Sequence, residues 1–131
     1  TNISAIYTRA AIKLNPERVI EILSQSHELE DTAQAFADYD YKVHHELAVA
    51  GNNRIYVLIL NGFRGFYSKI GCHYFSDAGT RELARQFYKD LTILAENKEH
   101  DGAISMMRKY GHQTGEIWQK IRGDMPSDIM D

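Results

Sequence analysis

Glycines alternate with polar and aromatic residues in the stretch Tyr110–Trp118, whose sequence is YGHQTGEIW. At about 100° per residue, a helix here places four residues on one face: Gly111, Thr114, Gly115 and Trp118. Each glycine inside a helix costs about 1 kcal/mol relative to alanine, so two of them one turn apart require a compensating reason. The bare backbone predicts a shallow trough with walls at Trp118 and Tyr110, in which Thr114 offers a hydroxyl to a ligand. The alternative is close packing of a neighbouring helix against the glycines.

A second set of residues has the chemistry of metal ligands. Asp40 and His44 are one helical turn apart and share a face, as ligand pairs do in helical metal sites. Asp90 and His112 lie on other expected helices and could complete a site for a divalent metal. The alternative is an ordinary hydrogen bond between Asp40 and His44.

Nucleophilic catalysis has little support in the sequence. Cys72 and His73 are adjacent, so on a helix their side chains point about 100° apart and do not form a catalytic pair. The sequence contains no Gly-x-Ser-x-Gly, phosphate-loop or Cys-x-x-Cys motif. We therefore expect a protein that is not an enzyme.

Hydrophobic periodicity and capping residues predict an all-α protein, an antiparallel bundle of about six to seven helices that forms one domain over residues 1–131. The expected helices cover residues 2–14, 16–26, 32–49, 53–74, 77–96 and 101–122. Residues 55–60 favour a strand by propensity. A continuing apolar stripe instead predicts one long fourth helix, and its members are Ile59, Phe63, Phe66, Ile70 and Tyr74. Such aromatic stripes usually form core, but they would equally line an apolar tunnel.

Composition limits the possible partners of this chain. The 131 residues include 15 Lys and Arg against 18 Asp and Glu, a formal charge of −3 without a basic cluster, so we expect no nucleic-acid interface here. A single cysteine is compatible with the reducing cytoplasm. The longest apolar run is too short to span a membrane. Helical periodicity begins at once after Thr1, which predicts that the chain was cut from a larger protein.

Three stretches together resemble one family. They are DYDY at 38–41, GNNRIY at 51–56 with LILNG at 58–62, and YGHQTGEIW at 110–118. They are similar to the C-terminal effector domain of FadR, the fatty-acid-responsive regulators of the bacterial GntR family, from Thr1 to about Pro126. The resemblance implies an all-helical domain that binds long-chain acyl-CoA, and ligand binding would release the full-length homodimer from operator DNA. The DNA-binding part, an N-terminal winged helix-turn-helix, would lie outside this chain.

The resemblance also implies which residues bind the ligand. Three match positions linked to the acyl-CoA response, and three tyrosines match residues that line the ligand cavity. His44 stands where the best-known relative has an apolar aromatic residue, which implies a more polar cavity near that helix. The ligand residues implied are Gly111, Thr114, Trp118, Tyr110, Tyr67, Tyr74 and His44.

The wider GntR group supplies the main alternative. Many of its members bind a metal through Asp-x-x-x-His and two further histidines. Asp40, His44 and His112 resemble three of these ligands, and Asp90 stands at the fourth position. The leading hypothesis is a sensor of long-chain acyl-CoA that needs no cofactor. Its rivals are a zinc- or nickel-dependent sensor of a small organic acid and a purely structural helical dimerisation module.

Overall fold

The computed structural model describes residues 2–122, in which the backbone forms seven α-helices and one short 3₁₀ helix. The helices are α1 (Asn2–Leu14), α2 (Pro16–Ser24), η1 (Gln25–Glu28), α3 (Ala33–Ala50), α4 (Arg54–Gly62), α5 (Arg64–Tyr74), α6 (Ala78–Glu96) and α7 (Gly102–Arg122). Within these residues there is no strand, and the predicted all-α class is confirmed. In the described part of the chain, no helix is long and apolar enough to cross a membrane.

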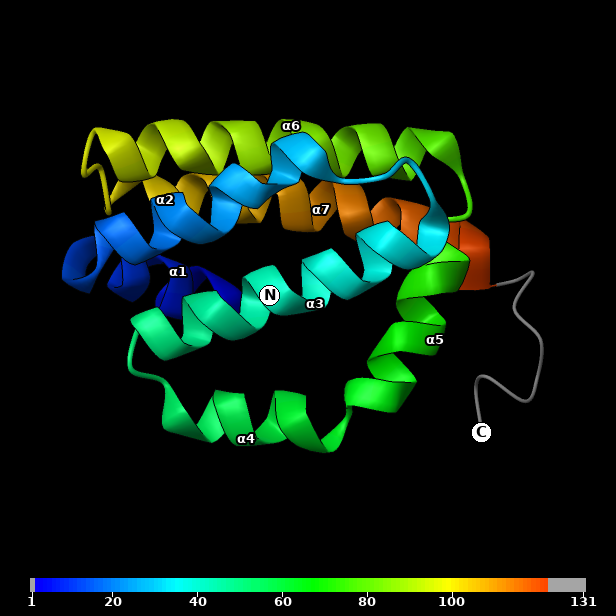
Figure 1. Ribbon diagram of the computed structural model, residues 1–131, viewed down its shortest axis with the longest axis horizontal. Helices are drawn as coiled ribbons and strands as arrows, with labels where there is room; N and C mark the ends of the chain where they lie inside the picture. The colour runs from blue at the N-terminus through cyan, green and yellow to red at the C-terminus, as the bar shows by residue number, and fades with distance from the viewer. Residues whose placement is uncertain (1, 123–131) are drawn as a thin grey trace.

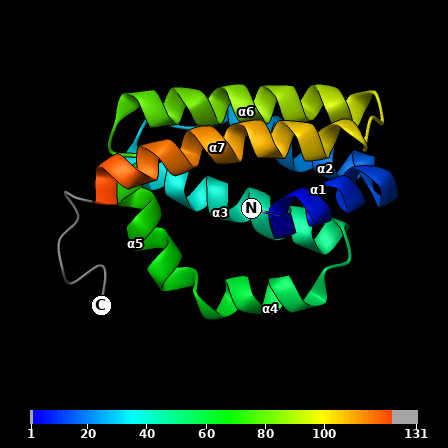
Figure 2. The same cartoon turned by 180° about the vertical axis from the view of Figure 1, so that it is seen from behind.

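The helices form a bundle, and α4 and α5 form an arm on one side of it (Figure 1). The antiparallel pair α6 and α7 lies over α2 and α1, and α3 crosses below them (Figures 1 and 2). Helix α5 packs along α3 at one end of the bundle, while α4 contacts mainly α3. The Tyr56 ring of α4 also lies 5.1 Å from the Tyr7 ring of α1. The core lies where α1, α2, α3 and α6 meet, and its largest fully buried side chains include Tyr7, Phe36 and Tyr88.

Side-chain caps fix several of the helix starts. The Thr32 side chain accepts a hydrogen bond from the Ala35 N–H at 3.1 Å, and the Asn53 side chain accepts one from the Tyr56 N–H at 3.0 Å. These bonds satisfy backbone donors that have no partner in the first turn, and they confirm the predicted starts of α3 and α4. Asn15 behaves differently, because its amide donates to the Ala50 carbonyl at 3.2 Å and does not cap α2.

The prediction of one long fourth helix is wrong. The chain bends at Phe63, where φ is −109° and ψ is 15°, and the segment becomes α4 and α5. Gly62 and Gly65 on either side are poor helix formers, so the bend costs little. It lets α5 turn onto α3, where the Tyr67 ring lies 5.5 Å from the Tyr41 ring.

The bend also changes which side chains the apolar stripe buries. Ile59, Phe63 and Phe66 were expected in the core, but they are 45%, 59% and 50% exposed. Only the later members of the stripe face inward, and Tyr74 is 7% exposed. A straight helix would keep all of these side chains on one face, whereas two helices at an angle cannot.

Candidate ligand-binding site

A cavity of about 410 Å³ lies among five helices, within the size range of small-molecule sites. Helices α1, α3, α5, α6 and α7 all contribute to its walls. Most of its lining is apolar or aromatic. The lining residues are Ser4, Ala37, Asp40, His44, Tyr67, Ile70, Gly71, Tyr74, Phe75, Leu83, Ala84, Phe87, Met107, Tyr110, Gly111, Thr114, Gly115 and Trp118.

The face of α7 singled out in the sequence borders this cavity. Gly111, Gly115 and Trp118 all line it, as does the Thr114 side chain. A Cβ atom built at Gly115 would meet no neighbouring atom within 4 Å, so this glycine does not serve the close packing of another helix. The open space beside Gly115 agrees with the trough predicted from the glycine spacing.

Each of the other residues implied by the family resemblance also lines the cavity. Tyr67 and Tyr74 come from α5, His44 from α3 and Tyr110 from α7. Residues far apart in the sequence are thus brought to one space.

Trp118 and Tyr74 form one end of the cavity. Their rings are stacked with centroids 5.3 Å apart and an interplanar angle of 21°. Burial raises the pKa of Tyr74, and a side-chain hydrogen bond with Thr114 partly opposes that shift. The hydroxyl of Thr114 is therefore held beside the two rings, where it borders the cavity.

Phe87 lies at the other end of the cavity and contacts two further lining residues. Its ring lies 6.2 Å from His44 and 5.3 Å from Tyr110. The Tyr110 hydroxyl donates to Asp90 Oδ2 at 2.5 Å. Burial and this carboxylate together raise the pKa of Tyr110, which keeps the hydroxyl protonated.

Asp40 and His44 place a polar pair in this otherwise apolar lining. Asp40 Oδ1 accepts a hydrogen bond from the Tyr88 hydroxyl at 2.7 Å. The Tyr7 hydroxyl lies 2.8 Å from His44 Nδ1. His44 Nε2 lies 3.7 Å from Asp40 Oδ2, which is too long for a hydrogen bond. The ordinary i, i+4 hydrogen bond considered for Asp40 and His44 therefore does not form.

The four residues considered as alternative metal ligands do not gather in one group. His112 is 77% exposed and pairs with Glu116 at 3.0 Å on the outer face of α7. Asp90 accepts a hydrogen bond from the Tyr110 hydroxyl and not from His44. Among the residues that the structure describes, no three His, Cys, Asp or Glu side chains gather in a metal-binding group. The reason is helix rotation, since His112 follows Gly111 by one residue and points about 100° away from it.

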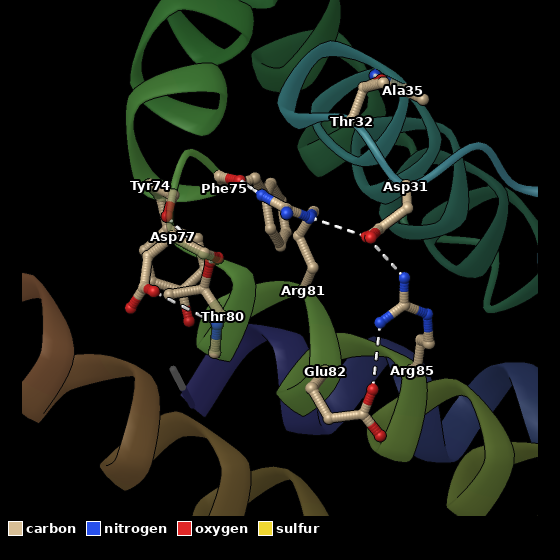
Figure 3. Close-up of polar contacts among 11 residues, drawn as sticks. Asp31, Thr32, Ala35, Tyr74, Phe75, Asp77, Thr80, Arg81, Glu82 and Arg85 are labelled. Carbon is tan, nitrogen blue, oxygen red and sulfur yellow. Dashed lines mark hydrogen bonds and ion pairs between the residues drawn. The ribbon is translucent and has the colours of Figure 1, made fainter.

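Polar contacts fix the end of α5 that carries Tyr74 (Figure 3). The Thr80 hydroxyl donates to the Tyr74 carbonyl at 2.8 Å, and Arg81 donates to the Phe75 carbonyl at 2.7 Å. Arg81 also contacts Asp31 at 2.8 Å, and Asp31 pairs with Arg85 at 2.6 Å. These hydrogen bonds lower the pKa of Asp31 and keep it ionised. The α2–α3 connection, the end of α5 and the start of α6 are thereby tied together at one wall of the cavity.

Several lining residues escaped the sequence analysis of the site. Gly71 is one, and a Cβ there would come within 3.2 Å of the Ala37 Cβ, so it permits the close approach of α5 to α3. Phe87 is another, and its side chain is buried at 7% exposure. Only the packing of α6 beside α3 and α7 shows that the same ring also borders an open space. Ser4 had no signal, because α1 comes from the opposite end of the sequence.

Comparison with known proteins agrees with this architecture. The family model described as the FadR C-terminal domain matches residues 1–130. The chain belongs to this family. Among the relatives of the chain, the fatty acid metabolism regulator protein of Shewanella oneidensis is 51% identical over 98% of the chain and 54% of the relative. The protein of the same name from Shewanella baltica is 46% identical over the same shares. The chain therefore spans about half the length of the curated relatives it matches.

Proposed function

We propose that this chain is the ligand-sensing domain of a regulator of fatty acid metabolism and that its cavity binds a long-chain acyl-CoA. One observation carries the proposal: in a chain of the FadR C-terminal domain family, the bare face of α7 opens onto a cavity. The relatives named as regulators of fatty acid metabolism support the regulatory part.

Burial of the acyl chain would supply most of the affinity. The cavity walls are mainly apolar, and each CH₂ group removed from water contributes about 0.8 kcal/mol. Lengthening the chain from about eight to about sixteen carbons would thus add roughly 6 kcal/mol at most. Such a gain is sufficient to distinguish long chains from short ones.

The polar part of the ligand would lie along α7. Gly111 and Gly115 allow a thioester and its pantetheine to approach the helix closely, because no side chain projects from either position. Thr114 offers its hydroxyl on the same face, and Trp118 covers the adjacent end.

Regulation would follow from a shift between two packed arrangements of the bundle. A ligand that binds one arrangement better moves the equilibrium toward it, by no more than its difference in affinity. Helix packing changes between discrete states. A ligand that pushes α5 and α7 apart would therefore cause a conformational change that extends to other parts of a longer regulator. In this proposal the full-length protein is a cytoplasmic homodimer that leaves its operator DNA when acyl-CoA binds.

Calorimetry with acyl-CoAs of graded length tests the proposal. We expect the affinity to rise from octanoyl-CoA to palmitoyl-CoA, and Trp118→Ala to weaken palmitoyl-CoA binding about tenfold or more. Phe63→Ala serves as the matched control, because Phe63 is 59% exposed and lies outside the cavity lining. Folded protein that binds none of these ligands would contradict the proposal and favour the structural dimerisation module.

A further inference from the structure

Two ionisable side chains interrupt the apolar lining of the cavity. Asp40 and His44 both border it, and their side chains are only 19% and 17% exposed. A plain hydrocarbon laid against them would remove water from a carboxylate and offer no hydrogen bond in return, which is unfavourable. Asp40 and His44 therefore affect which acyl chains bind in the cavity.

Two tyrosines determine how this pair presents its hydrogen-bonding groups. Tyr88 is fully buried and donates to Asp40 Oδ1, which leaves Oδ2 as the carboxylate oxygen next to His44. Tyr7 is 2% exposed, and its hydroxyl lies 2.8 Å from His44 Nδ1. Burial is the main cause that raises the pKa of both tyrosines, so both remain protonated donors.

The Asp40 carboxylate beside Nε2 favours the neutral tautomer of His44 that carries its hydrogen on Nε2. In this tautomer Nδ1 accepts a hydrogen bond from the Tyr7 hydroxyl. The result is a donor at Nε2 and an acceptor at Asp40 Oδ2, separated by 3.7 Å. This separation is too long for a direct hydrogen bond, so the two groups do not satisfy each other.

Among the groups that an acyl chain can carry, a hydroxyl completes this arrangement. It can donate to Asp40 Oδ2 and accept from His44 Nε2 at the same time. A carbonyl could only accept, an ammonium could only donate, and a methylene could do neither. A carboxylate would bring a second negative charge next to Asp40.

We propose that Asp40 and His44 bind a hydroxyl group carried on the aliphatic chain of the ligand, so that the cavity prefers hydroxylated acyl chains to plain ones. This inference rests on the proposed function, since it specifies the chain that enters the same cavity. The two residues act together as a specificity determinant. A site built to hydrogen-bond a hydroxyl discriminates strongly against an analogue that lacks it.

The position of the pair indicates where on the chain the hydroxyl lies. His44 stacks with Phe87, which contacts Tyr110, whereas Trp118 and Tyr74 form the opposite end. Tyr110 and Trp118 are eight residues apart on α7, which corresponds to about 12 Å along the helix axis. With the thioester at the Trp118 end of this face of α7, the hydroxyl lies well inside the chain and not next to the thioester.

The test compares palmitoyl-CoA with two hydroxylated isomers by calorimetry. One isomer carries its hydroxyl at mid-chain and the other carries it on the β-carbon. We expect the mid-chain isomer to bind the protein about tenfold more tightly than palmitoyl-CoA, and the β-hydroxy isomer to show no such gain. The corresponding free acids are measured as well, and the same preference among them would show that the hydroxyl is recognised without the CoA part.

Variants assign the preference to the pair. His44→Phe should abolish the preference for the mid-chain isomer over palmitoyl-CoA. His112→Phe is the matched control and should retain the preference, because His112 lies on the outer face of α7. Asp40→Asn, which keeps the shape of the side chain, provides the same test if His44→Phe does not fold.

The outcomes separate this inference from the proposed function. Equal affinity for palmitoyl-CoA and the mid-chain isomer, or a preference that survives both His44→Phe and Asp40→Asn, would overturn the hydroxyl site and leave acyl-CoA sensing intact. Failure of folded protein to bind any of the acyl-CoAs would instead overturn the proposed function, and the hydroxyl site with it.

Discussion

Asp40 is held in place by a tyrosine that solvent does not reach. The Tyr88 hydroxyl donates to Asp40 Oδ1 at 2.7 Å, and the Tyr88 ring packs edge-on against Tyr39 at 5.0 Å. This hydrogen bond compensates the carboxylate for part of the water it loses beside the cavity. The hydrogen bond from Tyr88 therefore orients the Asp40 carboxylate and lowers the free-energy cost of burying it.

Replacing Tyr88 by Phe tests this dependence. The ring would keep its packing, but Asp40 would lose its buried donor, so we expect the free energy of unfolding to fall by about 1–3 kcal/mol. Urea unfolding followed by circular dichroism measures the change. In the Asp40→Asn background the same substitution should cost less, and an equal cost in both backgrounds would show that Tyr88 does not act through Asp40.

At the scale of the helices, the α4–α5 arm has two differently anchored parts. Helix α4 rests mainly on α3 and leaves Ile55 and Leu58 more than 70% exposed. Helix α5 lies along α3 and is fixed at its far end by Thr80 and Arg81. The part of the arm that borders the cavity is thus the part that is firmly held.

The crossing of α1 over the end of α3 depends on Gly51. A Cβ atom at this position would lie 2.5 Å from the Tyr7 carbonyl oxygen, which belongs to the backbone and cannot rotate away. The glycine therefore allows α1 to approach α3 closely enough for Tyr7 to reach His44. The two helices form one wall of the bundle because of this contact.

Gly51→Ala should destabilise the protein by about 1–3 kcal/mol, because either helix must shift to relieve the clash. Gly65→Ala is the matched control, since a Cβ there would meet nothing within 4 Å. We expect the control to be neutral or to stabilise α5 by up to about 1 kcal/mol, as alanine favours helices. Thermal and urea unfolding of both variants measure the difference, and equal effects would contradict the proposed close approach.

For the molecule as a whole, buried tyrosines couple stability to alkaline pH. Burial is the main cause that raises the pKa of Tyr7, Tyr67 and Tyr88 above the ordinary value near 10. Below pH 10 these hydroxyls are neutral in both folded and unfolded chains, and their contribution to stability is complete. Above pH 10 the unfolded chain loses protons that the folded chain keeps, so unfolding becomes more favourable as the pH rises.

We therefore expect the free energy of unfolding to fall above about pH 10, by about 1.4 kcal/mol per pH unit for each of these tyrosines. Urea unfolding across this pH range, with phenolate absorbance followed in parallel, measures both quantities. Tyr67→Phe should make the decline less steep. Ionisation of all the tyrosines near pH 10 in a chain that remains folded would contradict the assignment.

Much of the site could be predicted from the sequence because its central part lies on one helix. The periodicity of α7 alone places Gly111, Thr114, Gly115 and Trp118 on one face, and Thr32, Asn53 and Asp77 predict where helices begin. These are local properties, fixed by helix geometry and by the hydrogen bonds of the first turn. The all-α class follows from the same local patterns.

Only the tertiary structure decided how faces of different helices meet. The bend at Phe63 depends on the surface of α3 that α5 can cover, and His112 faces outward because its neighbour Gly111 faces the cavity. The gap of 3.7 Å between Asp40 and His44 depends on tyrosines from α1 and α6. Periodicity specifies directions around a single helix axis, whereas the rotation and distance between axes are set by burial of contacts that are remote in sequence.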